Sequence, residues 1–142
     1  MSPCSKTMAE NFGAELKVHD TVEFVLDYLV GRVTFKQIDE PIVIHTTCST
    51  RKTGLAEKFE KIARMCSSNV TIPADITCCG FAGDRGFTFP ELNKTALRHL
   101  KASIPEGTRL AFSTSKTCEI GLSEESGLDY RSIFYLIERC ID

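Results

Sequence analysis

From residue 41 onward, the sequence alternates short runs rich in β-branched residues with longer stretches of helical periodicity. Strands are expected at 41–47, 70–77 and 110–112, the second interrupted by Pro73. Strands separated by helices pair in parallel, so this order predicts an α/β fold with a small parallel sheet flanked by helices. With 142 residues, 42% of them hydrophobic, the chain can bury one main core without cross-links.

Four helices are expected around these strands. Asp20 and Glu23 form a candidate capping box for the first helix, which ends near Gly31. The second helix is expected to be capped by Ser49 or Thr50, and the third to begin at Pro90. Their expected core-facing residues are, helix by helix, Val22, Val25, Leu26, Leu29 and Val30; Leu55, Phe59, Ile62, Ala63 and Cys66; Leu92, Ala96, Leu97 and Leu100; and Ile133, Leu136, Ile137 and Cys140.

Charge and the amino terminus limit the classes of function. Charged residues make up 25% of the chain with both signs mixed, and the formal net charge is −2, so no nucleic-acid partner is expected. No apolar run is long enough to span a bilayer, and residues 1–12 lack the basic and apolar regions of a signal peptide. We therefore expect a cytoplasmic protein with no transmembrane segment, whose thiols are kept reduced.

Cysteines follow each of the three expected strands. Cys48 comes after the first, Cys78 and Cys79 after the second, and Cys118 just beyond the third. The carboxyl ends of parallel strands lie along one edge of a sheet, where ligands bind, so the four sulfurs are expected to converge into a metal site. Basic residues close in sequence could compensate anionic thiolates; they are Arg51, Lys52, Arg85 and Lys116.

Three glycines follow the paired cysteines at every third position: Gly80, Gly83 and Gly86. They let the backbone approach a bulky inorganic centre and turn amide donors toward its sulfurs, so we expect Gly80 and Gly83 to contact a cofactor. The spacing does not match a dinucleotide-binding loop, and the sequence contains no phosphate loop. A nucleotide-binding function is therefore rejected.

Several functions remain open for the cysteines. Neighbouring cysteines cannot easily chelate one tetrahedral ion but can bind different metals of a polynuclear cluster, which favours iron–sulfur over a single zinc ion. A structural zinc module and a thiol–disulfide domain with Cys78 or Cys79 as nucleophile are the alternatives, the second weakened by the lack of a Cys-x-x-Cys motif. Cys66 and Cys140 are expected to be core residues. His45 is expected to be a hydrogen-bonded structural residue rather than a ligand or proton carrier.

Three motifs carry a family resemblance: His45-Thr-Thr-Cys48, Cys78-Cys-Gly-Phe-Ala-Gly83 and Thr117-Cys-Glu-Ile-Gly121. In this order they resemble the cysteine-rich CCG domain. That domain occurs in heterodisulfide reductase, in the iron–sulfur component of glycolate oxidase and at the carboxyl end of FAD-linked D-lactate dehydrogenases. The resemblance covers residues 41–142 and is greatest to the D-lactate dehydrogenase type.

The resemblance implies electron transfer. It implies that Cys48, Cys78, Cys79 and Cys118 bind an iron–sulfur cluster of the 4Fe-4S type, which would be lost on purification in air. It further implies a larger oxidoreductase in which an FAD domain oxidises a 2-hydroxy acid such as D-lactate or glycolate. Other iron–sulfur domains, a quinone or cytochrome acceptor and a peripheral position at the inner membrane would belong to that parent enzyme. By itself this chain is expected to be non-catalytic.

Two positions depart from the family pattern. Gly121 stands where the heterodisulfide reductase pattern has its last cysteine, so the non-cubane cluster of that family would lose one ligand here. Ser49 stands where a histidine often follows the first cysteine. Four cysteines still suffice for an ordinary four-iron cluster.

The two ends of the chain share a spacing. Cys4 is followed by Glu10 and Gly13 at the same offsets at which Cys118 is followed by Glu124 and Gly127. This match predicts that residues 1–31 are the tail of a preceding CCG repeat and that residues 32–142 form the CCG domain. In that case Cys4 would be a ligand of the other repeat.

Overall fold

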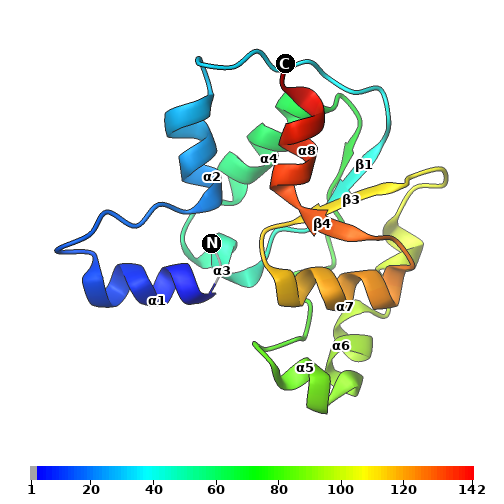
Figure 1. Ribbon diagram of the computed structural model, residues 1–142. Helices are drawn as coiled ribbons and strands as arrows, with labels where there is room; N and C mark the ends of the chain where they lie inside the picture. The colour runs from blue at the N-terminus through cyan, green and yellow to red at the C-terminus, as the bar shows by residue number, and fades with distance from the viewer. Residues whose placement is uncertain (1–2) are drawn as a thin grey trace.

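The computed structural model describes residues 3–142, with side chains from residue 6 onward, and contains a four-stranded parallel sheet (Figure 1). The strand order is β2-β1-β3-β4, and every neighbouring pair is parallel. The strands are β1 (Ile42–Ile44), β2 (Val70–Thr71), β3 (Leu110–Ser113) and β4 (Tyr130–Ser132). The α/β prediction is therefore confirmed, although β4 was not predicted and β2 is much shorter than 70–77.

Helices cover both faces of the sheet (Figure 1). The upper face in that view carries α2 (Thr21–Phe24), the π-helical turn η1 (Val25–Leu29), α4 (Ala56–Cys66) and α8 (Ile133–Cys140). The lower face carries α5 (Arg85–Thr88), α6 (Pro90–Leu97) and α7 (Lys116–Ser126), and the 3-10 turn η2 (Lys101–Ser103) follows α6. The remaining helices, α1 (Pro3–Phe12) and α3 (Cys48–Lys52), lie at the side where β1 ends.

The sheet separates two apolar clusters because neighbouring residues of a strand point to opposite faces. Ile42, Ile44 and Phe112 pack with residues of α4 and α8. Val43, Ala111 and Tyr130, which are paired across three strands, pack on the other face with residues from the segment of α5 to α7. All three residues of β1 are buried, so both faces of this strand are covered, as expected of a parallel strand between two layers of helices.

The helix expected near residue 20 forms as predicted at its start. The Asp20 side chain accepts a hydrogen bond from the Val22 amide and the Glu23 side chain reaches back to the Asp20 amide, so the capping box is present. The helix continues as the π-helical turn η1 and ends at Val30. Gly31 follows with a φ of +86°. That left-handed conformation suits glycine.

Two helix predictions need correction. The segment after Cys48 is split into two helices at Gly54, whose φ is +72°, and α3 is capped by Thr47 rather than by Ser49 or Thr50. In α6, Leu92 is 44% exposed, and the buried side chains are those of Asn93 and Leu97. By contrast, all four expected core residues of α8 are buried.

Among the residues that the structure describes, no helix combines the length and the apolar character that a membrane span needs.

Two residues of α8 offer a test of this packing. Leu136 is fully buried between the sheet and α4, whereas Phe134 is 43% exposed. Leu136→Ala is expected to lower the free energy of unfolding by about 2–5 kcal/mol, because it removes buried methyl groups and leaves a cavity. Phe134→Ala is the matched control and should change it by no more than about 0.5 kcal/mol. Urea denaturation measures both, and equal effects would contradict the packing of α8.

Candidate metal centre

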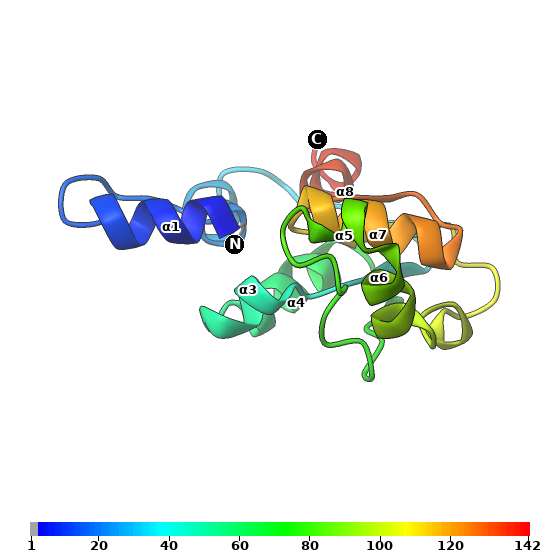
Figure 2. The same ribbon diagram turned by 90° about the horizontal axis from the view of Figure 1, so that it is seen from below.

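The order of the strands reverses between β1 and β3, and ligands bind at such a switch point, beyond the carboxyl ends of the strands. Cys48 follows β1 as the first residue of α3, and Cys118 follows β3 in the first turn of α7. The loop with Cys78 and Cys79 enters from β2 and leads to α5 on the side of α7 (Figure 2). The expected convergence at this edge therefore has its structural basis in the β1–β3 pair.

Cys79 and Cys118 form a buried pair. Their sulfurs lie 3.0 Å apart, and the two residues are 4% and 7% exposed. The distance exceeds that of a disulfide, about 2.05 Å, so both are free thiols. The two thiols share a hydrogen bond. When Cys79 loses its proton, the Cys118 thiol donates to the thiolate, which lowers the pKa of Cys79 and raises the pKa of Cys118.

Cys48 and Cys78 form a second pair on the solvent side. Both residues are exposed, and Cys48 lies close enough to Cys78 to interact with it electrostatically. The second pair is connected to the first, because Cys48 lies close enough to Cys118 to interact with it electrostatically and Cys78 does the same with Cys79. The four sulfurs from three distant segments thus form two neighbouring pairs, one buried and one exposed.

The loop after the paired cysteines turns its amides toward the sulfurs. The Gly80 N–H donates to Cys78 Sγ over 3.4 Å, and the Phe81 backbone amide lies close enough to Cys79 to favour its thiolate. Three residues of this loop have positive φ angles: Gly80 (+74°), Ala82 (+48°) and Gly83 (+80°). Such left-handed turns let successive amides point into one concavity that favours negative charge.

Asn93 holds this loop in place and was missed in the sequence. Its Nδ2 donates to the carbonyl of Cys79 over 2.5 Å, and the residue is 2% exposed. Asn93 also explains Gly121, because a Cβ at position 121 would collide with the Asn93 amide and with the Phe81 ring. The position of the missing family cysteine is therefore filled by other side chains. One polar residue within a helical apolar stripe was the only sequence signal.

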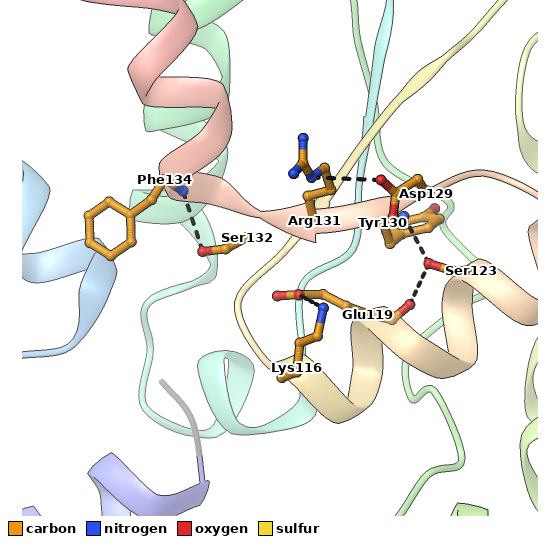
Figure 3. Close-up of polar contacts among 8 residues, drawn as sticks. All are labelled: Lys116, Glu119, Ser123, Asp129, Tyr130, Arg131, Ser132 and Phe134. Carbon is orange, nitrogen blue, oxygen red and sulfur yellow. Dashed lines mark hydrogen bonds and ion pairs between the residues drawn. The ribbon is translucent and has the colours of Figure 1, made fainter.

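The basic residues near the cysteines serve different contacts. Arg51 Nε donates to the carbonyl of Thr46 over 3.3 Å. Lys116 pairs with Glu119 over 3.4 Å at the start of α7 (Figure 3), and burial raises the pKa of this carboxyl. Lys52 lines an open cavity of about 300 Å³ beside Cys48, together with Lys6 of α1.

His45 contradicts the expectation of a hydrogen-bonded structural residue. It is 2% exposed at the end of β1, and neither ring nitrogen has a hydrogen-bond partner in the described part of the chain. Burial, with a smaller contribution from the nearby Arg51 charge, lowers the pKa of His45 to about 4. An unpartnered buried polar group costs roughly 1–3 kcal/mol, so this imidazole is a destabilising feature of the protein alone.

The remaining cysteines lie away from this site. Cys66 and Cys140 are buried on the opposite face of the sheet, where the Cys140 thiol donates to the carbonyl of Cys66, so both have the predicted core positions. Burial raises the pKa of both thiols. The side chain of Cys4 lies outside the described residues.

Four free thiols approach one another here, and the Gly80 amide donates to one of their sulfurs, a set of groups that suits a thiophilic metal centre. No three His, Cys, Asp or Glu side chains in the described range lie close enough together to bind one metal ion. In a tetrahedral zinc site all the sulfurs lie about 3.8 Å apart. The ligands of a polynuclear cluster bind different metal atoms and can be farther apart.

The fold and the thiols define an α/β domain with a cysteine centre at its switch point. A comparison with family models agrees: the model described as "CCG: Cysteine-rich domain" matches residues 42–123, more than half of the chain. The chain therefore belongs to the CCG cysteine-rich domain family. Such domains occur in oxidoreductases, and membership indicates a metal-binding or redox role. No curated protein and no solved structure matched the chain.

The two loop glycines provide a test of the loop geometry. A Cβ at Gly80 would lie 2.5 Å from the Leu92 carbonyl, whereas a Cβ at Gly83 would meet nothing within 4 Å. Both residues have positive φ. Gly83→Ala should therefore cost only about 1–2 kcal/mol of unfolding free energy, and Gly80→Ala about 1–3 kcal/mol more because of the collision. Urea denaturation of the two variants measures the difference, and an equal loss would refute the packing of Gly80 on α6.

His45 provides a test by pH. Its pKa of about 4 in the folded protein lies below the ordinary 6.5, so below pH 6.5 the unfolded chain takes up a proton that the folded protein does not. The contribution of this residue to stability is complete above pH 6.5 and falls by up to about 3 kcal/mol as the pH falls to 4. Urea titrations of His45→Gln from pH 7 to 4 should show a correspondingly weaker acid dependence than the wild type. Parallel curves would contradict the burial of His45.

Proposed function

We propose that this chain is the iron–sulfur electron-transfer domain of a larger flavin-linked oxidoreductase. Cys48, Cys78, Cys79 and Cys118 would hold the cluster, and the loop glycines Gly80 and Gly83 would lie against it. A cluster of the 4Fe-4S type supplies one-electron transfer when bound. The observation that carries the proposal is the approach of four thiols from three distant segments at the switch point of the sheet.

Two local features support a cluster over isolated thiols. Amides that donate to cysteine sulfurs stabilise negative charge there, and such hydrogen bonds also set the potential of iron–sulfur centres. The exposed pair, Cys48 and Cys78, would place one side of the cluster at the surface. Electrons could then enter or leave there without passing through the core.

The parent enzyme is proposed from the family resemblance. In it an FAD domain would oxidise a 2-hydroxy acid of the D-lactate or glycolate type, and further iron–sulfur domains would relay electrons to a quinone or cytochrome. This chain would contribute the relay and no substrate chemistry of its own. Residues 32–142 would be the CCG domain, with residues 1–31 the end of a preceding repeat that includes Cys4.

The buried pair supports a second candidate, thiol–disulfide exchange. The Cys79 and Cys118 sulfurs lie 3.0 Å apart, and the Cys118 hydrogen bond favours the Cys79 thiolate, which is the nucleophilic form. Closing a Cys79–Cys118 disulfide would release two electrons and two protons to another disulfide, which would be reduced to two thiols. A structural zinc module is disfavoured because no three His, Cys, Asp or Glu side chains of the described residues lie close enough together to bind one ion.

Metal analysis tests the proposal. Protein purified and reconstituted without oxygen, with ferrous iron and sulfide, should contain iron and acid-labile sulfide in near-equal amounts and absorb visible light. A variant with Cys78→Ser and Cys79→Ser should lose both, because it removes two of the four proposed ligands. Cys140→Ala, which removes a buried thiol on the opposite face, is the matched control and should retain them.

Other outcomes of the same measurement decide between the candidates. Stoichiometric zinc without sulfide would contradict the electron-transfer function and assign the chain as a structural zinc module. If no metal is bound and a Cys79–Cys118 disulfide forms reversibly with oxidised dithiothreitol, the exchange function would take its place.

A further inference from the structure

His45 is the one buried histidine of the described chain whose ring has no partner. Native proteins rarely leave a buried polar side chain without a hydrogen bond, and each exception needs an explanation. A ligand that is bound only in the working protein is one such explanation. The position of His45 in the sheet indicates which ligand that is.

The register of the sheet places His45 on the face of the buried cysteine pair. Val43 packs with Cys79 and Cys118 on the α7 face, while Ile44 packs on the α4 face. Side chains alternate along a strand, and the His45 amide continues the β1–β3 ladder by donating to the Phe112 carbonyl. His45 therefore returns to the face of Cys79 and Cys118, at the carboxyl end of β1.

The sequence adds a second constraint on this position. His45 precedes Cys48 by three residues, and the Arg51 side chain, bonded to the carbonyl of Thr46, is close enough to influence the His45 ring. The ring is thus buried near the Arg51 charge of α3, at a register position on the face of the sheet that carries the cysteine pair. No carboxylate or carbonyl accepts from it in the described chain. An occupant of the cysteine site would supply an acceptor on this side.

We propose that His45 is a fifth functional residue of the site, whose neutral imidazole donates its N–H to a sulfur of the metal–sulfur group held by the four cysteines and so sets its reduction potential. This inference rests on the proposed function. A donor to sulfur stabilises the added negative charge of the reduced state, so it raises the potential. In this role His45 is a hydrogen-bond donor to the bound group and binds no metal.

Two substitutions separate this role from a structural one. His45→Phe keeps a planar ring and removes the N–H, while His45→Gln keeps a donor without a ring. In the metal-free protein at pH 7, His45→Phe should leave the melting temperature unchanged or raise it, because it removes an unpartnered buried polar group. In the reconstituted protein it should lower the ratio of reduced to oxidised cluster at a fixed potential about tenfold, a shift of about 59 mV. The His45→Gln variant, which keeps a donor, should have a ratio of reduced to oxidised cluster close to that of the wild type.

Tyr130→Phe is the matched control. The Tyr130 hydroxyl is also buried without a partner on the same face, two residues farther from the strand ends and two strands away from β1. Its removal should affect the melting temperature in the same direction but leave the potential unchanged. A shift in Tyr130→Phe equal to that in His45→Phe would overturn the specific role of His45.

The remaining outcomes are also decisive. A metal-free His45→Phe protein that melts well below the wild type would show that protein contacts hold the ring and would overturn the inference. Loss of iron in both His45 variants would make the residue a ligand rather than a hydrogen-bond donor and would likewise overturn it. An unchanged potential in a fully loaded His45→Phe protein would refute it while leaving the proposed function intact. A wild type that assembles no iron and sulfide would end both proposals.

Discussion

The parallel pairing of β1 with β3 is the interaction on which the site depends. It places the end of β1, with Cys48, beside the end of β3, with Cys118, although 70 positions separate them in the sequence. The pairing joins Ile42, Val43 and Ile44 to Leu110, Ala111 and Phe112, residues buried or half-buried between two helical layers. A one-residue slip would exchange the faces of β1 and move Val43 away from the cysteine cluster. Burial of the strand thus fixes the geometry of the thiols.

The cysteine loop meets a different requirement, that of a backbone folded tightly enough to turn its amides toward sulfur. Gly80 adopts a left-handed conformation and also packs against the Leu92 carbonyl. Glycine is therefore favoured at this position both by the backbone angle and by the lack of room for a Cβ. Ala82 adopts a positive φ without being glycine, a strained conformation that the surrounding structure must hold. The hydrogen bond from Asn93 to the Cys79 carbonyl supplies part of that support. The strained backbone conformation thus lies in the loop that directly follows Cys78 and Cys79.

The sequence predicted most of the α/β frame and the segments that carry the thiols, because hydrophobic periodicity and strand-end cysteines are local signals. It missed β4, because Tyr130-Arg131-Ser132 has only one buried apolar residue. It also missed α7, where Gly121 and two serines obscure the apolar stripe. The roles of Asn93 and of Gly121 depend on the contact of α6 with α7, and no local pattern encodes a contact between two helices. The break between α3 and α4 was missed for a different reason, since Gly54 interrupts the helix through its left-handed conformation and the apolar periodicity continues past it.

The arrangement of the thiols in two pairs bears on the kind of centre they serve. A protein that holds one tetrahedral ion gains by preforming all its ligands around one point, because every sulfur must lie the same short distance from the metal. Here one pair is buried and in contact, the other is exposed, and the loop between them is lined with amide donors. Leaving the His45 ring without a partner is a cost that an apolar residue would avoid. A larger sulfur-rich group would bridge the two pairs and bring sulfurs of its own, one of which would offer the imidazole an acceptor, whereas a single ion brings none.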